Sequence, residues 1–330
     1  RLLLTAADVY GGLIGLYFVL RLAVGDRFGP VALVGAFLHW LLLPGLPLFG
    51  LMLALRRWRR AALAAVPVIA FVGLFGGLFL PDLRREIGCG GPPKVCRGLT
   101  VMTYNIGGGL ADPESVAAAI RASGADVAGL VEVSAGQAEG LGAALADAYP
   151  HRVMAGLGFS GLGLASRYPI LEAGLVYPQR EYLPYLLATL DVDGAPLTVI
   201  VYHLKPPVLV LRVPGLRYVE WPLDNTLTST ALARAPAIVM GDFNTTDQGG
   251  NYRQLARAGL RDAWRAAGWG YGATYPARIG GNRTLPVTQL VRVDYVWVTG
   301  EFTVRRAWRG PDAGSDHLPV LAEVVWQVEQ

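Results

Sequence analysis

The chain has 330 residues, of which 53% are hydrophobic and 16% charged, and its formal net charge is +4. This length accommodates two ordinary domains, and the composition is too apolar for one soluble domain of average make-up. Residues 1–97 carry 11 Lys or Arg and 4 Asp or Glu, a balance of +7, whereas residues 98–330 carry 18 and 21, a balance of −3. The C-terminal part therefore lacks the overall basic charge of a typical nucleic-acid-binding domain, although local basic patches stay possible.

Three apolar stretches open the chain, each about as long as the ~20 residues that a membrane-spanning helix needs. They are Leu2–Val24, Val31–Leu55 and Ala61–Leu80. We expect Pro44 and Pro47 to kink the second stretch, which spanning helices tolerate. Three such stretches in a row favour a three-helix transmembrane region over residues 1–80 rather than buried helices of a soluble domain. A cleaved signal peptide would account for the first stretch only.

The loop between the second and third stretches holds four arginines, Arg56, Arg57, Arg59 and Arg60. Lys and Arg collect in short loops on the cytoplasmic side of a membrane. The sequence thus predicts a multi-pass protein of the cytoplasmic membrane, with everything after Leu80 on the extracytoplasmic side.

Residues 81–97 form a Gly- and Pro-rich linker that contains both cysteines of the chain, Cys89 and Cys96. Disulfides persist in oxidising compartments, so an extracytoplasmic linker favours a bond between them. Two free thiols are the alternative. Half of a metal site is a weaker one, because no further cysteine exists and His151 is far along the chain.

Residues 98–330 read as one globular domain with more strands than helices. Helices are expected from Pro113 to about Ser123, with Asp112 as the N-cap, and over Ala135–Ala148. Strands are expected at Leu99–Asn105, Asp126–Val133, Leu162–Ser166, Leu186–Val192, Leu197–Tyr202, Ala237–Met240, Val293–Val298 and Leu318–Val325. Because strands and helices do not strictly alternate, the pattern favours an α/β four-layer sandwich of two packed mixed β-sheets flanked by helices.

Polar residues recur at the ends of these strands, where side chains meet at the rim of a sheet. Singly, each has a structural explanation: acids and amides are common in turns, and a lone histidine is more often structural. The sequence Gly156–Gly161 fits G-x-G-x-x-G but leads into a strand, so we interpret it as a rim loop and not a dinucleotide site. The strand-end residues are Asn105, Glu132, His203, Asp242, Asn244, Asp294, Asp316 and His317.

Taken together, their order and motifs resemble the endonuclease/exonuclease/phosphatase superfamily, which includes DNase-I-like nucleases, sphingomyelinases and inositol-polyphosphate phosphatases. The motifs are Gly241-Asp242-Phe243-Asn244, the terminal Ser315-Asp316-His317, and Ser166-Arg167-Tyr168-Pro169-Ile170. The resemblance covers residues 98–328. It implies a metal-dependent hydrolase acting on phosphoric ester or anhydride bonds.

The resemblance also implies roles for these residues. Asn105, Glu132 and Asp316 would bind Mg²⁺ or Mn²⁺, since hard cations prefer oxygen ligands. Asp242 would orient or deprotonate the attacking water, with Asn244 fixing the phosphate and Asp242. His317, oriented by Asp294, and His203 would stabilise the developing negative charge. Nucleases of this group often have a second acid after the first-strand Asn, but this chain has Gly107-Gly108-Gly109 there, so no second metal ligand is expected on that loop.

The three-helix layout resembles membrane-tethered VanJ-type teicoplanin-resistance proteins. That resemblance implies a phosphatase or phosphodiesterase acting on a lipid-linked phosphate, such as a polyprenyl pyrophosphate or a phospholipid. Alternatives are a membrane-anchored nuclease, which the −3 balance disfavours, and an inactive membrane scaffold, which the complete set of site residues disfavours. The bilayer is the expected partner, and the sequence indicates no protein partner.

The segment after His203 supports a lipid substrate. Lys205-Pro206-Pro207 is followed by Val208-Leu209-Val210-Leu211, with Arg212, Arg217, Tyr218 and Trp221 further on. Apolar residues beside an active site often mark a membrane or ligand contact, and Tyr and Trp favour the membrane interface. The alternative is that 208–211 forms a core strand or the start of a helix.

Overall fold

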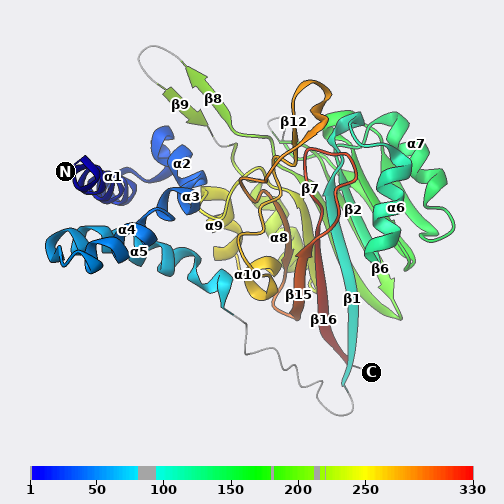
Figure 1. The fold of residues 1–330 in the computed structure, drawn as a ribbon. Helices are drawn as coiled ribbons and strands as arrows, with labels where there is room; N and C mark the ends of the chain where they lie inside the picture. The colour runs from blue at the N-terminus through cyan, green and yellow to red at the C-terminus, as the bar shows by residue number, and fades with distance from the viewer. Residues whose placement is uncertain (1, 81–93, 180–181, 212–215, 220, 330) are drawn as a thin grey trace. The chain divides into compact units, whose positions relative to one another are not determined.

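The computed structural model describes residues 2–80, 94–179, 182–211, 216–219 and 221–329. The chain divides into two compact units (Figure 1). The first contains residues 1–80 together with two later segments, 207–220 and 247–250. The second contains residues 81–206, 221–246 and 251–330. The predicted pairing of Cys89 with Cys96 lies outside the described residues, because Cys89 falls within 81–93.

The first unit is mainly helical. Two helices are long and apolar enough to cross a membrane, over Leu4–Val24 and Trp58–Phe79, and a bent pair could make a third span. The helices and 3₁₀ turns are α1 (Leu2–Val24), η1 (Gly25–Arg27), α2 (Gly29–Ala36), α3 (Leu38–Leu42), α4 (Gly45–Ala54), α5 (Trp58–Phe75) and η2 (Gly76–Phe79).

The second predicted span is not one continuous helix. Gly29–Ala36 and Leu38–Ala54 meet at an angle of 75°, so the sharp bend lies at Phe37 and not at either proline. A smaller break separates α3 from α4 at Leu43 and Pro44. Pro44 has no N–H for the bond to the preceding turn, which explains that break. The predicted second stretch is therefore kinked, but mainly at Phe37, and the bent pair of helices is the candidate for a third span.

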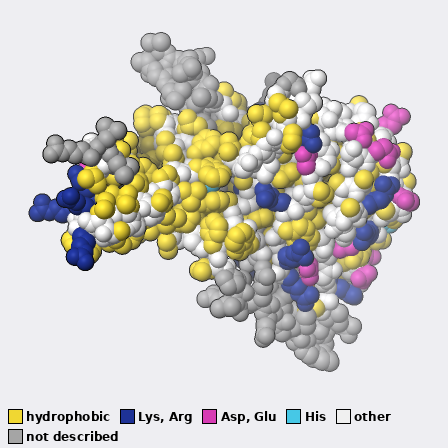
Figure 2. Space-filling view, viewed as in Figure 1, with side chains coloured by type: hydrophobic (Ala, Val, Ile, Leu, Met, Phe, Trp, Pro, Cys, Tyr) yellow, Lys and Arg dark blue, Asp and Glu magenta, His cyan; other side chains and the backbone are white. Residues whose placement is uncertain are grey.

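Large apolar side chains face outward along α1 and α5. Leu13, Val19, Leu22 and Ile69 are all more than half exposed, and Figure 2 shows hydrophobic side chains over much of the visible surface of these helices. Such a contiguous apolar surface is rare on soluble monomers and is typical of a membrane or protein contact.

In the sequence, the two later segments of the first unit lie between elements of the second unit. Strands β8 (Val208–Leu211) and β9 (Leu216–Val219) pair antiparallel, and we call this pair the β8–β9 hairpin; α2 packs against β9. The sequence left open whether 208–211 is a core strand. It is a strand, but it belongs to this separate two-stranded sheet.

The second unit contains two six-stranded mixed sheets packed face to face. The first has the order β15-β16-β1-β2-β4-β3 and the second β11-β14-β10-β7-β6-β5. Its strands are β1 (Lys94–Asn105), β2 (Val127–Val131), β3 (His151–Ala155), β4 (Leu162–Ser166), β5 (Ile170–Val176), β6 (Tyr185–Val192), β7 (Ala195–His203), β10 (Ala237–Asp242), β11 (Arg261–Asp262), β14 (Asp294–Val298), β15 (Phe302–Arg309) and β16 (Val320–Glu329), with a small hairpin of β12 (Arg278–Ile279) and β13 (Leu285–Pro286).

Helices cover the outer faces of both sheets. One apolar cluster joins the first sheet to α6 (Pro113–Ser123) and α7 (Ala135–Ala144), and another joins the second sheet to α8 (Asn225–Ala233) and α9 (Gly250–Arg257). α10 (Ala263–Ala267) and the 3₁₀ turns η3 (Gly107–Gly109), η4 (Gly158–Ser160) and η5 (Gly281–Arg283) complete the unit. The four-layer α/β sandwich that the sequence predicted is confirmed.

The sheets approach closely at β2. A Cβ on Gly129 would lie 2.9 Å from Met240 and from Val201 of the opposite sheet, so only glycine fits there without movement. The sequence underestimated β1, which begins at Lys94 because its first residues pair with the end of β16. It overestimated α7, which ends at Ala144.

Candidate active site

Strand register brings three of the predicted site residues together. β7, β10 and β14 are neighbours, and Asp242 of β10 pairs in register with His203 of β7 and with Asp294 of β14. Gly241 makes this possible, because its φ is +149° and a Cβ there would collide with the carbonyl of Tyr202. The Gly-Asp sequence is therefore required by the backbone as well as by the chemistry.

The other sheet contributes Asn105 and Glu132. β1 and β2 are parallel, so the residues that follow them share one edge. Asn105 donates from Nδ2 to Glu132 Oε1 at 3.1 Å and to Asp242 Oδ2 at 2.9 Å. Its Oδ1 accepts the N–H of Gly107 at 2.9 Å. One amide thus links the carboxylates of the two sheets.

Two site residues have backbone conformations that side chains other than glycine rarely adopt. Glu132 has φ +58° and Asn244 has φ +45°. Such strained residues persist where the surroundings hold them and are concentrated at functional sites. The carbonyl of Glu132 accepts from Gly108 N–H at 2.8 Å, and the N–H of Asn244 donates to Asp242 Oδ1 at 2.8 Å.

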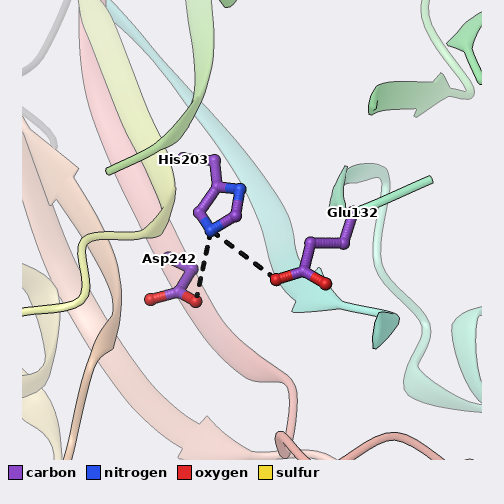
Figure 3. Close-up of side chains that lie close together, drawn as sticks. All are labelled: Glu132, His203 and Asp242. Carbon is purple, nitrogen blue, oxygen red and sulfur yellow. Dashed lines mark ion pairs between the residues drawn. The ribbon is translucent and has the colours of Figure 1, made fainter. Parts of the chain in front are cut away.

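His203 is neutral and carries its proton on Nδ1. Its Nδ1 lies 2.9 Å from the carbonyl of Phe159, which only accepts. Its Nε2 lies 3.3 Å from Nδ2 of Asn244, which donates. Burial lowers the pKa of His203 to about 4. Its Nε2 faces Glu132 at 3.6 Å and Asp242 at 3.9 Å (Figure 3), so these contacts involve an imidazole lone pair.

His317, in contrast to the neutral His203, is positively charged. Its Nδ1 lies 2.9 Å from Asp294 Oδ2, and its Nε2 lies 3.7 Å from Asp242 Oδ2. Burial alone lowers the pKa of His317, but the carboxylates of Asp294 and Asp242 outweigh it and raise that pKa to about 9. His317 is therefore an imidazolium near neutral pH, held in orientation by Asp294 as the sequence predicted.

Asp242 lies between the two histidines and is fully buried. Burial raises its pKa to about 7, although the charge of His317 acts in the opposite direction. A carboxyl with a pKa near the working pH can accept and release a proton, which is the property of a general base. Asp242 therefore has a neutral imidazole, His203, on one side and a charged imidazolium, His317, on the other.

Asn244 holds its neighbours rather than facing outward. Its Nδ2 donates to the carbonyl of Leu204 at 2.8 Å as well as facing His203. Both of its side-chain hydrogens are therefore engaged within the site. The arrangement assigns Asn244 to positioning Asp242 and His203.

Asp316 is the predicted site residue that is not gathered with the rest. Its carboxylate forms an ion pair with Arg283 of η5, and within the described residues it belongs to neither group of clustered metal-ligand side chains. The sequence did not single out Arg283, which is distant in the chain and carries no motif.

Two further residues that the sequence did not predict support the site. Ser315 donates from Oγ to the carbonyl of Asn105 at 2.6 Å and accepts the N–H of His317 at 3.2 Å. Phe159, in the glycine-rich rim loop, packs its ring 4.6 Å from His203. Ser315 could have been found from its place in Ser-Asp-His. The position of Phe159 carries no sequence signal.

The residues present fit a divalent cation at Glu132. Ligand atoms of Glu132, His203 and Asp242 all lie within 4.8 Å of one another, and the Glu132 side chain is 20% exposed. Glu132 Oε1 is contacted by Nδ2 of Asn105 and Nε2 of His203. Both groups are neutral, so neither balances a negative charge on the Glu132 carboxylate. Asn105 meets the carboxylates through nitrogen, so its oxygen would face a cation only after the amide rotates.

The similar proteins carry the same fold. A crystal structure of an endonuclease/exonuclease/phosphatase from Beutenbergia cavernae is 25% identical, covering 70% of this chain and 72% of that one, with TM-score 0.51. A mannosyl-6-phosphatase from Bacteroides thetaiotaomicron is 18% identical, covering 68% and 99%, with TM-score 0.51. D. rerio TDP2 complexed with a single-stranded DNA product is 19% identical, covering 69% and 98%, with TM-score 0.51. None of the curated proteins matches.

The profile of the Endonuclease/Exonuclease/phosphatase family matches residues 102–317. That interval begins in β1 and ends at His317. It therefore includes every strand-end residue gathered around Asp242, together with Asp316. On this match, the chain belongs to the endonuclease/exonuclease/phosphatase family.

Proposed function

We propose that this protein is a membrane-anchored, divalent-metal-dependent phosphoesterase that hydrolyses a lipid-linked phosphate ester or diphosphate. The family description names nucleases and phosphatases, which both cleave phosphate esters. The observation that supports a lipid substrate is the hairpin β8–β9. It follows directly after the strand that carries His203, yet it folds with the apolar helices of the first unit.

The rim of the second unit supports the same substrate class. Leu157 and Phe159 are exposed in the loop whose carbonyl binds His203, and Ile279 and Leu285 are exposed on the hairpin β12–β13. Exposed apolar residues grouped beside a polar site are typical of a surface that meets lipid or an apolar ligand.

Glu132, with Asn105 after rotation of its amide, would hold a divalent cation such as Mg²⁺ or Mn²⁺. When bound, the cation neutralises charge on the phosphoryl oxygens. Asp316, which the family resemblance assigns to the metal, would first have to release Arg283.

The remaining residues provide proton transfer and charge stabilisation. Asp242 accepts a proton from the attacking water, and its raised pKa strengthens it as a base. His317, charged and held by Asp294, stabilises negative charge as the ester bond breaks. Neutral His203 presents only its Nε2 lone pair, so it orients water or binds the cation; stabilising an anion would require it to gain a proton.

We further propose that the Arg56–Arg60 loop is cytoplasmic and the catalytic unit extracytoplasmic, following the charge asymmetry of the loops. A bond between Cys89 and Cys96 would agree with that compartment. Reporter fusions placed after Leu80 should behave as extracytoplasmic. Fusions that behave as cytoplasmic would overturn the orientation.

The substrate is tested with a panel of phosphate esters and the full-length protein. The panel contains a polyprenyl diphosphate and a phospholipid in vesicles, short-chain soluble analogues of both, and single-stranded and duplex DNA. We expect hydrolysis of one lipid class, abolished by chelator and by Glu132→Gln. Hydrolysis of DNA alone would favour the nuclease alternative, and activity that persists with chelator present would rule out the metal mechanism.

The hairpin is tested by changing Val208, Leu209 and Leu211 together to Ser. Hydrolysis of the vesicle substrate should fall while hydrolysis of the soluble analogue is retained. The matched control changes Leu171 and Tyr177 to Ser, two exposed residues on or next to β5 of the second unit. Equal loss on both substrates would show that the hairpin is not a lipid contact.

A further inference from the structure

Asp316 is a buried carboxylate whose charge is balanced by an arginine from the β12–β13 hairpin. Its side chain is 3% exposed, and Nη1 of Arg283 donates to its Oδ2. Its Oδ1 lies 3.4 Å from the hydroxyl of Ser315. A buried carboxylate is costly unless a positive charge or hydrogen bonds compensate it. The Arg283 guanidinium therefore supplies the positive charge that a cation bound to Asp316 would supply.

The backbone of Arg283 is fixed, whereas its side chain is half exposed. Gly280, Asn282 and Arg283 have φ values of +91°, +56° and +50°, which residues other than glycine rarely adopt away from functional sites. The N–H of Arg283 donates to the carbonyl of Gly280 at 3.0 Å, and the carbonyl of Thr284 accepts from Arg278 Nη1 at 3.3 Å. The Arg283 side chain is nevertheless 47% exposed. Rotation of this side chain is therefore sufficient for the guanidinium to change partner, without movement of the hairpin.

Arg283 also lines a groove of about 630 Å³ within the second unit. That volume lies within the range of about 300–1,000 Å³ that is typical of small-molecule sites. The walls come from α6 and from the β12–β13 hairpin. Leu110 also lines the groove and follows η3, in which a Cβ on Gly108 would lie 3.6 Å from Glu132 Oε2. The groove is therefore lined by one residue that binds Asp316 and by another that follows the turn beside Glu132.

The second arginine of the groove, Arg278, has a different kind of partner. Its Nε lies 2.9 Å from Asp312 Oδ2 and 3.2 Å from Oδ1, and its Nη2 lies 2.9 Å from Oδ2. Asp312 is not one of the strand-end residues that the family resemblance assigns to the site. Arg283 differs from Arg278 because its own partner, Asp316, is a candidate metal ligand.

We propose that Arg283 is an anion-binding residue that exchanges partners: it neutralises Asp316 while no divalent cation is bound, and once a cation binds Asp316 it binds a phosphate oxygen of the substrate in the groove. The proposal rests on the phosphoesterase function proposed above. A cation and a guanidinium on one carboxylate repel each other, so cation binding weakens the ion pair. The planar guanidinium matches the geometry of phosphate oxygens. Cation binding therefore prepares the groove for the phosphate.

The first test measures binding of Mn²⁺ alone to the full-length protein, by electron paramagnetic resonance of the free ion. Arg283→Gln should bind Mn²⁺ about 10-fold more tightly, since a hydrogen bond to a charged group contributes roughly that factor and no longer has to be broken. Arg278→Gln is the matched control, because it removes the same charge from the same hairpin but leaves Asp316 paired. Its Mn²⁺ affinity should stay close to that of the unchanged protein. Combined with Asp316→Asn, Arg283→Gln should no longer alter the affinity.

Arg283→Gln also leaves a buried carboxylate without its counter-charge, so circular dichroism is recorded with and without Mn²⁺. If the fold is lost in the absence of the ion, Mn²⁺ should restore it, because the cation replaces the missing charge and binds only the folded protein. A fold that Mn²⁺ does not restore would count against the exchange of partners.

The second test measures binding of inorganic phosphate by calorimetry at saturating Mg²⁺. Arg283→Gln should bind phosphate about 10-fold more weakly than the unchanged protein, whereas Arg278→Gln should bind it equally well. Without Mg²⁺, Arg283→Gln should cause no such loss, because the guanidinium of the unchanged protein is then engaged by Asp316.

Unchanged or weaker Mn²⁺ binding in Arg283→Gln would overturn the proposal, as would unchanged phosphate binding at saturating Mg²⁺. Neither measurement needs turnover. The expected differences in a protein that hydrolyses no phosphate ester would therefore reject the proposed function while retaining the exchange of partners. Hydrolysis of a phosphate ester without those differences would do the reverse.

Discussion

His203 ends β7 of one sheet and His317 shortly precedes β16 of the other. Both side chains are buried, yet their charges differ. Nδ1 of His203 meets the carbonyl of Phe159, and burial lowers the pKa of His203 to about 4. Nδ1 of His317 meets the carboxylate of Asp294, which with Asp242 raises the pKa of His317 to about 9 despite burial. Burial is common to both histidines, so the group that contacts Nδ1 decides the charge and hence the role of each imidazole.

The carboxyl of Asp242, which lies between the two histidines, is affected by this difference in charge. Asp242 Oδ2 lies 3.7 Å from Nε2 of His317 and 3.9 Å from Nε2 of His203. One neighbour stabilises its ionised form and the other does not. A site with a neutral acceptor, a titrating base and a cationic stabiliser is the combination that hydrolysis by an activated water requires.

The largest effect is expected from removing the shared carboxyl. Asp242→Asn should lower kcat by about 10³-fold, because it removes the general base that both histidines adjoin. Folding should be retained, since the amide can still accept from Asn244. Steady-state kinetics and circular dichroism measure the two. A loss below about 10-fold would mean that another group is the base.

The second prediction concerns the charge difference between the two histidines, which Asp294 maintains. Asp294→Asn removes the carboxylate that raises the pKa of His317, and kcat should fall by about 10²-fold at neutral pH. In the unchanged protein, activity should fall as pH rises through about 9, when His317 loses its proton. In Asp294→Asn this alkaline limit should move to lower pH. An unmoved limit would show that His317 does not set it.

The acid limit of the same profile reports on Asp242. Activity should rise as pH increases toward about 7, because the base must be ionised. A bound divalent cation stabilises the carboxylate, so the limit should move to lower pH as the metal concentration rises. A limit independent of metal would separate Asp242 from the cation site.

The neutral histidine should matter less. His203→Gln should lower kcat by about 10-fold, because an amide keeps an acceptor in this region but not the geometry of Nε2. Neither pH limit should move, since His203 stays neutral above about pH 4. A shifted alkaline limit in this variant would contradict the assignment of the cationic role to His317.

The smallest effect is expected from Phe159→Ala. The hydrogen bond to His203 comes from the backbone carbonyl, which this change retains, so kcat should change by no more than about 3-fold, about 0.6 kcal/mol. Leu171→Ala, an exposed apolar position on β5, serves as the control. A loss comparable to that of His203→Gln would show that the ring itself holds the imidazole.

The sequence by itself determined the apolar N-terminal region, the sandwich and the set of polar residues at strand ends. Periodicity and motifs such as Gly-Asp-Phe-Asn are local, and a side chain that follows a buried strand must lie at the sheet rim. For the same reason Asn105, Glu132, His203 and Asp242 could be named as candidates before their distances were known.

Only the tertiary structure decided how these residues are charged and held. The carbonyl of Phe159 comes from another strand connection than His203, and Arg283 reaches Asp316 from a separate hairpin. The inclusion of 207–220 and 247–250 in the helical unit likewise follows from contacts between distant parts of the chain. A pKa depends on burial and on the nearest partners, and both are properties of spatial neighbours that adjacent residues in the sequence do not specify.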